Sequence, residues 1–202
     1  MIMKLLPIGL AIVSGFFPFF AGAEVGVKAP DFILKDTTGK THSLQDYGDK
    51  IIVLEWYNPG CPFVKKHYES GNMQSLQSNY TSKGVVWLSI VSSAKGKQGN
   101  LDPEEHNRIR KDWYANEIPL LVDEDGKVGR LYSAKTTPHI FILARDGKLA
   151  YEGAIDDHAS TNPKDIKDSK NYVSEALNEI LSGKSVSTPE TESYGCSVKY
   201  GS

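Results

Sequence analysis

The chain of 202 residues contains only two cysteines, Cys61 and Cys196. Two cysteines exclude a disulfide-dense miniature scaffold and a four-cysteine zinc site. The five histidines are scattered, with no two in ligand spacing, so the sequence predicts no metal site. Haem-attachment, P-loop and dinucleotide-binding motifs are also missing, and we expect no cofactor. The two cysteines still suffice for one disulfide, or for a reactive thiol and its partner.

Neither sign of charge is in large excess. The 23 Lys and Arg nearly balance the 25 Asp and Glu, and no long basic run is present. Proteins that bind nucleic acid through its phosphates usually carry a basic patch. We therefore expect no nucleic-acid partner.

The longest apolar run is at the N-terminus, and it is short for a membrane-spanning helix. It follows Lys4 and covers residues 5–20, whereas a span needs roughly 20 residues. Ala21-Gly22-Ala23 then resembles a signal-peptidase site. We predict a signal peptide over 1–23, a domain over 24–183 and a polar tail over 184–202. The protein is then exported, periplasmic or extracellular, without a stable membrane anchor after cleavage, and its cysteines meet an oxidising compartment.

Strands and helices alternate along the predicted domain. The apolar runs 51–57 and 85–91 are typical of central strands covered on both faces. Helices are predicted from Cys61-Pro62, from Asn72 as a cap, over 102–116 and over 171–182. Segments 139–143 and 149–153 flank an Asp-Gly turn and form a hairpin. The order predicts an α/β, thioredoxin-like fold with a central mixed sheet and flanking helices.

Residues 55–68, EWYNPGCPFVKKHY, resemble the active-site segment of exported, peroxiredoxin-like redoxin-domain proteins of the thioredoxin superfamily. Segments 136–139, 153–157 and 194–200 extend the resemblance over nearly the whole mature chain. Two departures stand out. Val64 occupies the second cysteine position of a C-x-x-C motif, and Asn58 and Leu54 replace the Thr and Pro of the peroxiredoxin pattern P-x-x-x-T-x-x-C.

Cys61 is the candidate nucleophile because it lies where a predicted strand turns into a helix. The first-turn N–H groups and the positive end of the helix dipole stabilise a thiolate there, and Lys65 one turn later adds positive charge. The alternative is a buried structural cysteine. We expect the reactive thiol.

The resemblance implies a substrate-binding role for Thr137-Pro138. Pro138 would be cis and lie beside Cys61, and the backbone of Thr137 would pair with an extended substrate chain. An ordinary trans proline at the start of an edge strand is the alternative. Glu55, six residues before Cys61, is expected to have a raised pKa from burial and to exchange protons with a sulfur through water. It could instead pair with a nearby lysine.

Asp156 and Asp157 follow the last predicted strand. They could bind a cation or a basic group of a substrate, or cap the loop before the last helix, which we favour. His67 lies six residues after Cys61 and is assigned to the surface or to packing.

Cys196 lies on the tail, between Tyr194-Gly195 and Ser197-Val198. Two aromatics, an aliphatic residue and a glycine in 194–200 indicate a tail that docks. We predict a reversible Cys61–Cys196 disulfide, with a tail that becomes sensitive to proteases on reduction. The alternative is a tail thiol that pairs between two molecules.

These residues predict an exported thiol–disulfide oxidoreductase with Cys61 as nucleophile and Cys196 as remote resolving thiol. Its partners would be a protein disulfide and a thiol electron donor. One alternative is a thiol peroxidase in which Cys61 becomes a sulfenic acid. Another is a non-enzymatic binding module or metallochaperone with a structural disulfide.

Overall fold

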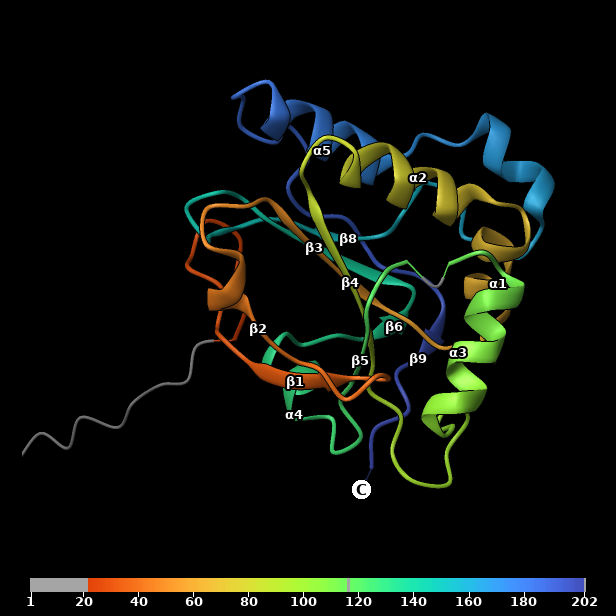
Figure 1. The fold of residues 1–202 in the computed structure, drawn as a ribbon. Coiled ribbons are helices and arrows are strands. Elements are labelled where there is room, and N and C mark those ends of the chain that lie inside the picture. The colour runs from red at the N-terminus through yellow and green to blue at the C-terminus, as the bar shows by residue number, and fades with distance from the viewer. Residues whose placement is uncertain (1–21, 116, 202) are drawn as a thin grey trace, which may run out of the picture.

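The computed structural model describes residues 22–115 and 117–201. Residues 1–21 of the predicted signal peptide lie outside the described residues. A mixed sheet of seven strands forms the centre, in the order β2-β1-β5-β4-β3-β7-β8. The strands are β1 Ile33–Asp36, β2 Thr41–Ser43, β3 Ile52–Trp56, β4 Val86–Val91, β5 Leu120–Val122, β7 His139–Leu143 and β8 Leu149–Gly153. β3, β4 and β5 are parallel, whereas β1, β2, β7 and β8 join antiparallel at the two edges, as Figure 1 shows.

Helices cover both faces of this sheet. They are α1 Pro62–Glu69, α2 Asn72–Thr81, α3 Pro103–Asp112, α4 Lys127–Leu131 and α5 Tyr172–Leu181, with 3-10 helices η1 Leu44–Tyr47 and η2 Pro163–Asp168. Alternate residues of β3 point to opposite faces. Val53 joins a core with α1, α2 and α5, and Ile52, Leu54 and Trp56 join the core beneath α4. The predicted thioredoxin-like α/β class is confirmed.

Two helix ends differ from the predictions. The third helix ends at Asp112 rather than near residue 116. Gly71, with φ +76°, is the N-cap of α2, so the capping role predicted for Asn72 is wrong. The Asn72 amide instead hydrogen-bonds His67 Nδ1 at 2.8 Å. A glycine caps there because the chain turns in the left-handed region between two helices.

The tail docks along the edge of the sheet, as predicted. Its residues 189–191 exchange backbone hydrogen bonds with Glu152 of β8. Further on, strand β9 (Cys196–Ser197) pairs antiparallel with β6 (Thr136–Thr137), so that Thr137 faces Cys196. The blue ribbon of β9 lies next to β6 in Figure 1. The side chain of Val198 is buried in the core beneath α4.

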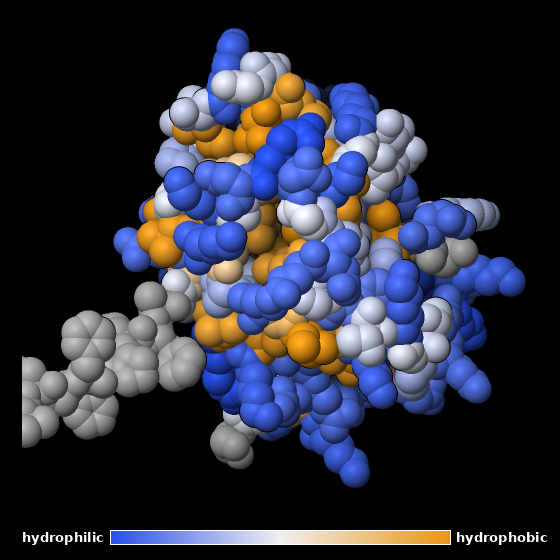
Figure 2. Space-filling model, turned by 60° about the vertical axis from the view of Figure 1, so that its left-hand side comes forward, coloured by the Kyte–Doolittle hydropathy of each residue, from blue (hydrophilic) through white to orange (hydrophobic). Residues whose placement is uncertain are grey.

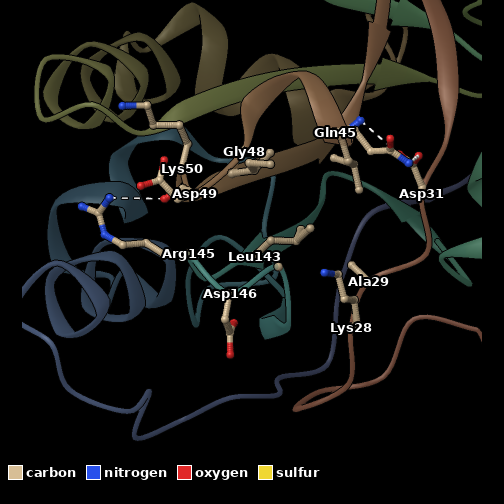
Figure 3. Close-up of a pocket in the computed structure, with 13 residues that line it drawn as sticks. Lys28, Ala29, Asp31, Gln45, Gly48, Asp49, Lys50, Leu143, Arg145 and Asp146 are labelled. Atoms are coloured by element: carbon tan, nitrogen blue, oxygen red, sulfur yellow. Dashed lines mark hydrogen bonds between the residues drawn. The ribbon is translucent and has the colours of Figure 1, made fainter.

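The surface beyond these elements is mixed in character. Figure 2 shows apolar side chains between hydrophilic ones on one face. A pocket of about 430 Å³ lies at the start of β3, lined by Leu44, Ile52, Leu143, Lys28, Lys50 and Arg145 among others (Figure 3). Because Cys61 follows the other end of β3, this pocket is remote from the cysteines. No helix in the described part of the chain is long and apolar enough to cross a membrane.

Candidate thiol site

The sheet register brings two segments of the predicted site together. Trp56, the last residue of β3, pairs with His139, the first residue of β7. The turn that leads to Cys61 therefore lies beside Thr137-Pro138. The Thr137–Pro138 peptide bond is cis, as the resemblance implied. Gly153, at the end of β8, pairs with Ile140, which brings the chain toward Asp156 to the same edge.

Cys61 is the N-cap of α1, and its side chain is completely buried. Its Sγ lies 2.9 Å from the carbonyl oxygen of Thr137 and donates to it when protonated. The predicted position at the strand-to-helix turn is confirmed. Unlike an open reactive thiol, Cys61 is covered by the docked tail.

The tail brings the second thiol to the first. Cys196 packs against the same core as Cys61, and the two thiols lie close enough to shift each other's pKa. Burial raises the pKa of Cys61, but the bond from Cys196 and contributions from Thr137 and the N–H of Val64 outweigh it and bring the pKa below its usual value. Burial, and then the bond to Cys61, raise the pKa of Cys196 to about 11. Of the two thiols, Cys61 is therefore the one that loses its proton at the lower pH.

Lys65 does not supply the positive charge expected near Cys61. It is exposed, and it is not among the groups that shift the pKa of Cys61. The buried lysine is its neighbour Lys66. Adjacent residues on a helix point about 100° apart, so one of them faces solvent and the other the sheet edge.

Glu55 is buried on the face of the sheet that α1 and α2 cover. Its carboxylate accepts hydrogen bonds from Tyr68, Gln77, Trp87 and Ser89. Burial raises its pKa, as predicted, although these bonds oppose the effect. Arg110 is the cation that acts on it, rather than a lysine. No hydrogen bond of the described residues joins Glu55 to a sulfur.

Asn58 occupies the place of the peroxiredoxin threonine, and its side chain is fully engaged. Its oxygen accepts from the Gly60 N–H at 2.9 Å, and its amide donates to the carbonyl of Gln98 at 3.2 Å. A Cβ on Gly99 would lie 2.6 Å from Asn58 Oδ1, so the 93–101 loop packs closely on it. The side chain shapes the turn before Cys61.

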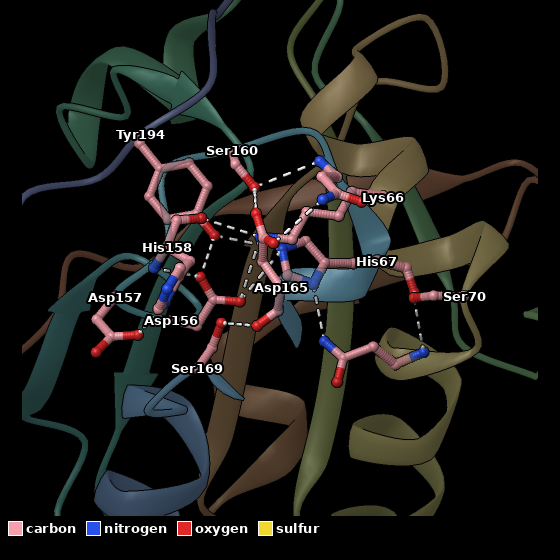
Figure 4. A network of polar contacts seen from close by, with 12 residues as sticks. Lys66, His67, Ser70, Asp156, Asp157, His158, Ser160, Asp165, Ser169 and Tyr194 are labelled. Atoms are coloured by element: carbon pink, nitrogen blue, oxygen red, sulfur yellow. Dashed lines mark hydrogen bonds and ion pairs between the residues drawn. The ribbon is translucent and has the colours of Figure 1, made fainter. Parts of the chain in front are cut away.

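A buried polar cluster beside the cysteines includes residues that the sequence did not single out. Lys66 Nζ lies 3.6 Å from Asp156 Oδ2 and donates to the carbonyl of His158 at 2.9 Å. His67 Nε2 lies 3.9 Å from the same carboxylate oxygen. The hydroxyl of Tyr194, two residues before Cys196, donates to Asp156 Oδ1, and Figure 4 shows these side chains converging.

The preference for loop-capping acids is right for both aspartates, since Asp156 Oδ1 accepts from the backbone N–H of His158 at 3.0 Å, but Asp156 also has buried side-chain partners. Asp157 is exposed and accepts from the backbone N–H of Lys170 and from His158. Asp156 is only 2% exposed and faces Lys66. In the ranges 22–115 and 117–201, no group of three or more His, Cys, Asp or Glu side chains is placed to hold a metal ion.

Comparison with known proteins agrees with this geometry. The chain is similar to the thiol-disulfide oxidoreductase ResA of Bacillus thuringiensis, with 26% identity over 145 residues, 72% of this chain and 78% of that protein. It is 30% identical to the thioredoxin-like protein YneN of Bacillus subtilis over 129 residues, 63% of this chain and 70% of that protein. An uncharacterized conserved protein of Geobacillus kaustophilus is 28% identical, with a TM-score of 0.74 over 88% of this chain and 93% of that chain.

The fold and the paired thiols define a redoxin-domain protein of the thioredoxin superfamily, as the sequence indicated. The AhpC/TSA family matches residues 25–152, more than half of the chain, and the protein belongs to that family. The relatives named as oxidoreductases agree with the class of activity predicted from the sequence.

Proposed function

We propose that this chain is an exported thiol–disulfide oxidoreductase in which Cys61 attacks a protein disulfide and Cys196 resolves the product. The observation that carries the proposal is the position of Cys196. It lies opposite Thr137 in a docked strand and packs against the same core as Cys61. A structural disulfide alone would not need the lowered pKa of one thiol and the raised pKa of the other, whereas an attacking and a resolving thiol do.

The reaction then takes two steps. The Cys61 thiolate attacks one sulfur of the substrate disulfide, the S–S bond breaks, and one substrate thiolate leaves. Cys196, after losing its proton, attacks Cys61 in the mixed disulfide and releases the second substrate thiol. Two electrons pass to the substrate, and the Cys61–Cys196 disulfide forms. A dithiol donor returns the pair to the reduced state by the reverse exchange.

Glu55 stays outside these steps. Its carboxylate oxygens are occupied by four protein donors. Proton exchange with Cys61 through water remains a prediction. The peroxidase alternative has less support, because Asn58 holds the turn and the adjoining loop rather than an open oxygen site.

Trapping the mixed disulfide tests the proposal. We expect reduced wild-type protein to release two thiols per substrate disulfide and Cys61→Ser to release none. Cys196→Ser should stop after one thiol and retain the substrate on Cys61, as peptide mapping would show. Release of two thiols by Cys196→Ser would contradict the resolving role. Oxidation of Cys61 by hydrogen peroxide much faster than that of free cysteine would favour the peroxidase.

Export is proposed from residues 1–23 and the paired cysteines. Expression of the full chain in a bacterium, followed by fractionation and N-terminal sequencing, tests it. We expect a product that begins at Glu24 outside the cytoplasm. An uncleaved chain in the cytoplasm would contradict both the predicted cleavage site and the predicted compartment.

A further inference from the structure

The backbone edge that would receive a substrate strand is occupied by the chain itself. β9 pairs with Thr136–Thr137, and Cys196 is the residue opposite Thr137. The contact is close: Gly195 has φ +138°, and a Cβ there would lie 2.2 Å from the carbonyl oxygen of Thr137. Glycine is required by this approach, so the sequence of the tail fits this edge. With β9 in place, Cys61 is wholly buried.

A second contact holds the same segment. The Tyr194 hydroxyl donates to Asp156, and its ring lies 5.8 Å from Phe63 and 5.6 Å from Lys66 Nζ. Asp156 is itself held against α1 by Lys66, with both side chains almost completely buried. Tyr194 is thus fixed to the first helix and to the loop after β8, two residues before the resolving thiol.

We propose that Asp156 is a positioning residue whose hydrogen bond to Tyr194 decides whether Thr137 is paired with the chain's own Cys196 strand or with an extended cysteine-containing segment of a substrate. The inference rests on the proposed function, in which Cys61 is the nucleophile. With the Asp156–Tyr194 contact formed, the internal disulfide is favoured and the edge is closed. With the contact broken, β9 leaves, and the edge accepts a strand that resembles the tail, with a small residue before its cysteine.

Two measurements separate this role from general loosening of the site. The first is the equilibrium of the Cys61–Cys196 disulfide against reduced and oxidised glutathione. The second, in a Cys196→Ser background, is the rate at which Cys61 attacks a peptide Ser-Tyr-Gly-Cys-Ser-Val whose cysteine carries a chromogenic thiol. In this second reaction the Cys61 thiolate bonds to the cysteine sulfur of the peptide, the bond between that sulfur and the chromogenic group breaks, and the chromogenic thiolate leaves.

We expect Tyr194→Phe to change the two quantities in opposite directions. It removes one hydrogen bond to a carboxylate while the ring packing stays. The equilibrium between the docked and the undocked tail should fall about tenfold, the size of one such bond, and this factor is divided between a lower internal disulfide equilibrium constant and a higher peptide rate. Asp156→Asn should act in the same direction. Asp156→Asn also leaves Lys66 without its counter-ion. Tyr194→Phe is therefore the variant that tests the positioning role.

Matched controls are available in the chain. Tyr200, on the same tail, donates to the carbonyl of Ala134, and Asp157 is exposed beside Asp156. Asp157→Asn should change both quantities less than about twofold. Tyr200→Phe, which loses a bond to a neutral carbonyl, should change them less than Tyr194→Phe does. A fall of both quantities in Tyr194→Phe, or equal effects of Tyr194→Phe and Tyr200→Phe, would overturn the positioning role.

Failure of the proposed function looks different. If Cys61→Ser releases the chromogenic thiol as fast as the protein with Cys61, Cys61 is not the nucleophile, whatever Tyr194 does. If Cys61 is reactive but the cysteines never pair under glutathione, both the resolving role and the positioning role are wrong.

Discussion

At the scale of single residues, the site depends on the unequal protonation of two neighbouring thiols. Cys61 has a lowered pKa, whereas burial and then the neighbouring Cys61 raise the pKa of Cys196. A thiolate loses nucleophilicity as the pKa of its thiol falls. A moderately lowered pKa therefore favours attack on a disulfide more than an extremely low one. At Cys61, burial opposes the hydrogen bonds that lower its pKa.

This polarisation predicts a difference between two variants of Cys196. Cys196→Ala removes the donor to Cys61, whereas Cys196→Ser keeps an O–H donor. We expect the pKa of Cys61 to be higher in the alanine variant, because its thiolate has lost a hydrogen bond. In both variants Cys61 is the sole cysteine, so its thiolate absorbance against pH reports it directly, with the corresponding Cys61→Ser variants as blanks. Equal midpoints would show that Cys196 does not stabilise the thiolate.

The residues that could be found from the sequence are those whose type and whose position in the predicted fold both indicate reactivity. A cysteine before proline at a strand-to-helix turn, and a second cysteine in an aromatic tail segment, identified both thiols. Lys66 could not be found in this way, and Asp156 was singled out only together with Asp157, without its burial. Charged residues in loops and helices are usually solvated, and only the packing of α1 against the loop after β8 shows that these two are buried.

At the scale of elements, the strand β9 is the unexpected feature. Two-residue strands such as β6 and β9 have no periodicity from which they can be predicted, since their pairing is set by tertiary contacts. The sequence did indicate docking of the tail, and the hydrogen bonds at 189–191 and 196–198 confirm it. Both cysteines are free thiols in this arrangement. The contacts of β9 hold the tail without the disulfide, so we expect it to stay docked on reduction, in place of the protease sensitivity predicted from the sequence.

The docked tail predicts how stability responds to oxidation. A disulfide between Cys61 and Cys196 closes a long loop, which restricts the unfolded chain by about 5 kcal/mol in the entropy model, less any native strain. We expect oxidised protein to melt higher than reduced protein, with the tail resisting limited proteolysis in both states. Cys196→Ser, which cannot form the disulfide, should melt at the same temperature in both buffers. Rapid cleavage within 184–195 of the reduced wild type alone would show that the tail undocks on reduction.

At the scale of the whole molecule, the sequence predicted the order of the helices and strands along the chain better than it predicted which strands pair in the sheet. The apolar runs at 51–57 and 85–91 became β3 and β4, which lie at the centre because every face of a parallel strand must be covered. The placement of β1 and β2 at the far edge of the sheet, beyond β5, depends on which hydrogen-bonding edges remain free, and the sequence carries no sign of it.

The buried histidines give the molecule a predictable dependence on pH. Burial lowers the pKa of His67 and of His106 to about 4 and that of His139 to about 3, against an ordinary 6.5. The unfolded chain therefore takes up these protons first as the pH falls. Their contribution to stability is complete above pH 6.5 and is lost as the pH falls toward 4, by up to about 1.4 kcal/mol per pH unit for each histidine.

His139→Asn tests this at one position. The asparagine oxygen can replace Nδ1 as acceptor for the backbone N–H of Lys135, but it takes up no proton. The variant should be less stable than wild type near neutral pH, because the ring lies 4.4 Å from that of Phe141 and that packing is lost. Its urea midpoint should nevertheless fall less than that of wild type between about pH 7 and about pH 5. Glu55, whose pKa is raised, changes stability in the opposite direction in both proteins, so it cancels in the comparison. An equal fall in the two proteins would show that His139 takes up its proton in the folded state as readily as in the unfolded one.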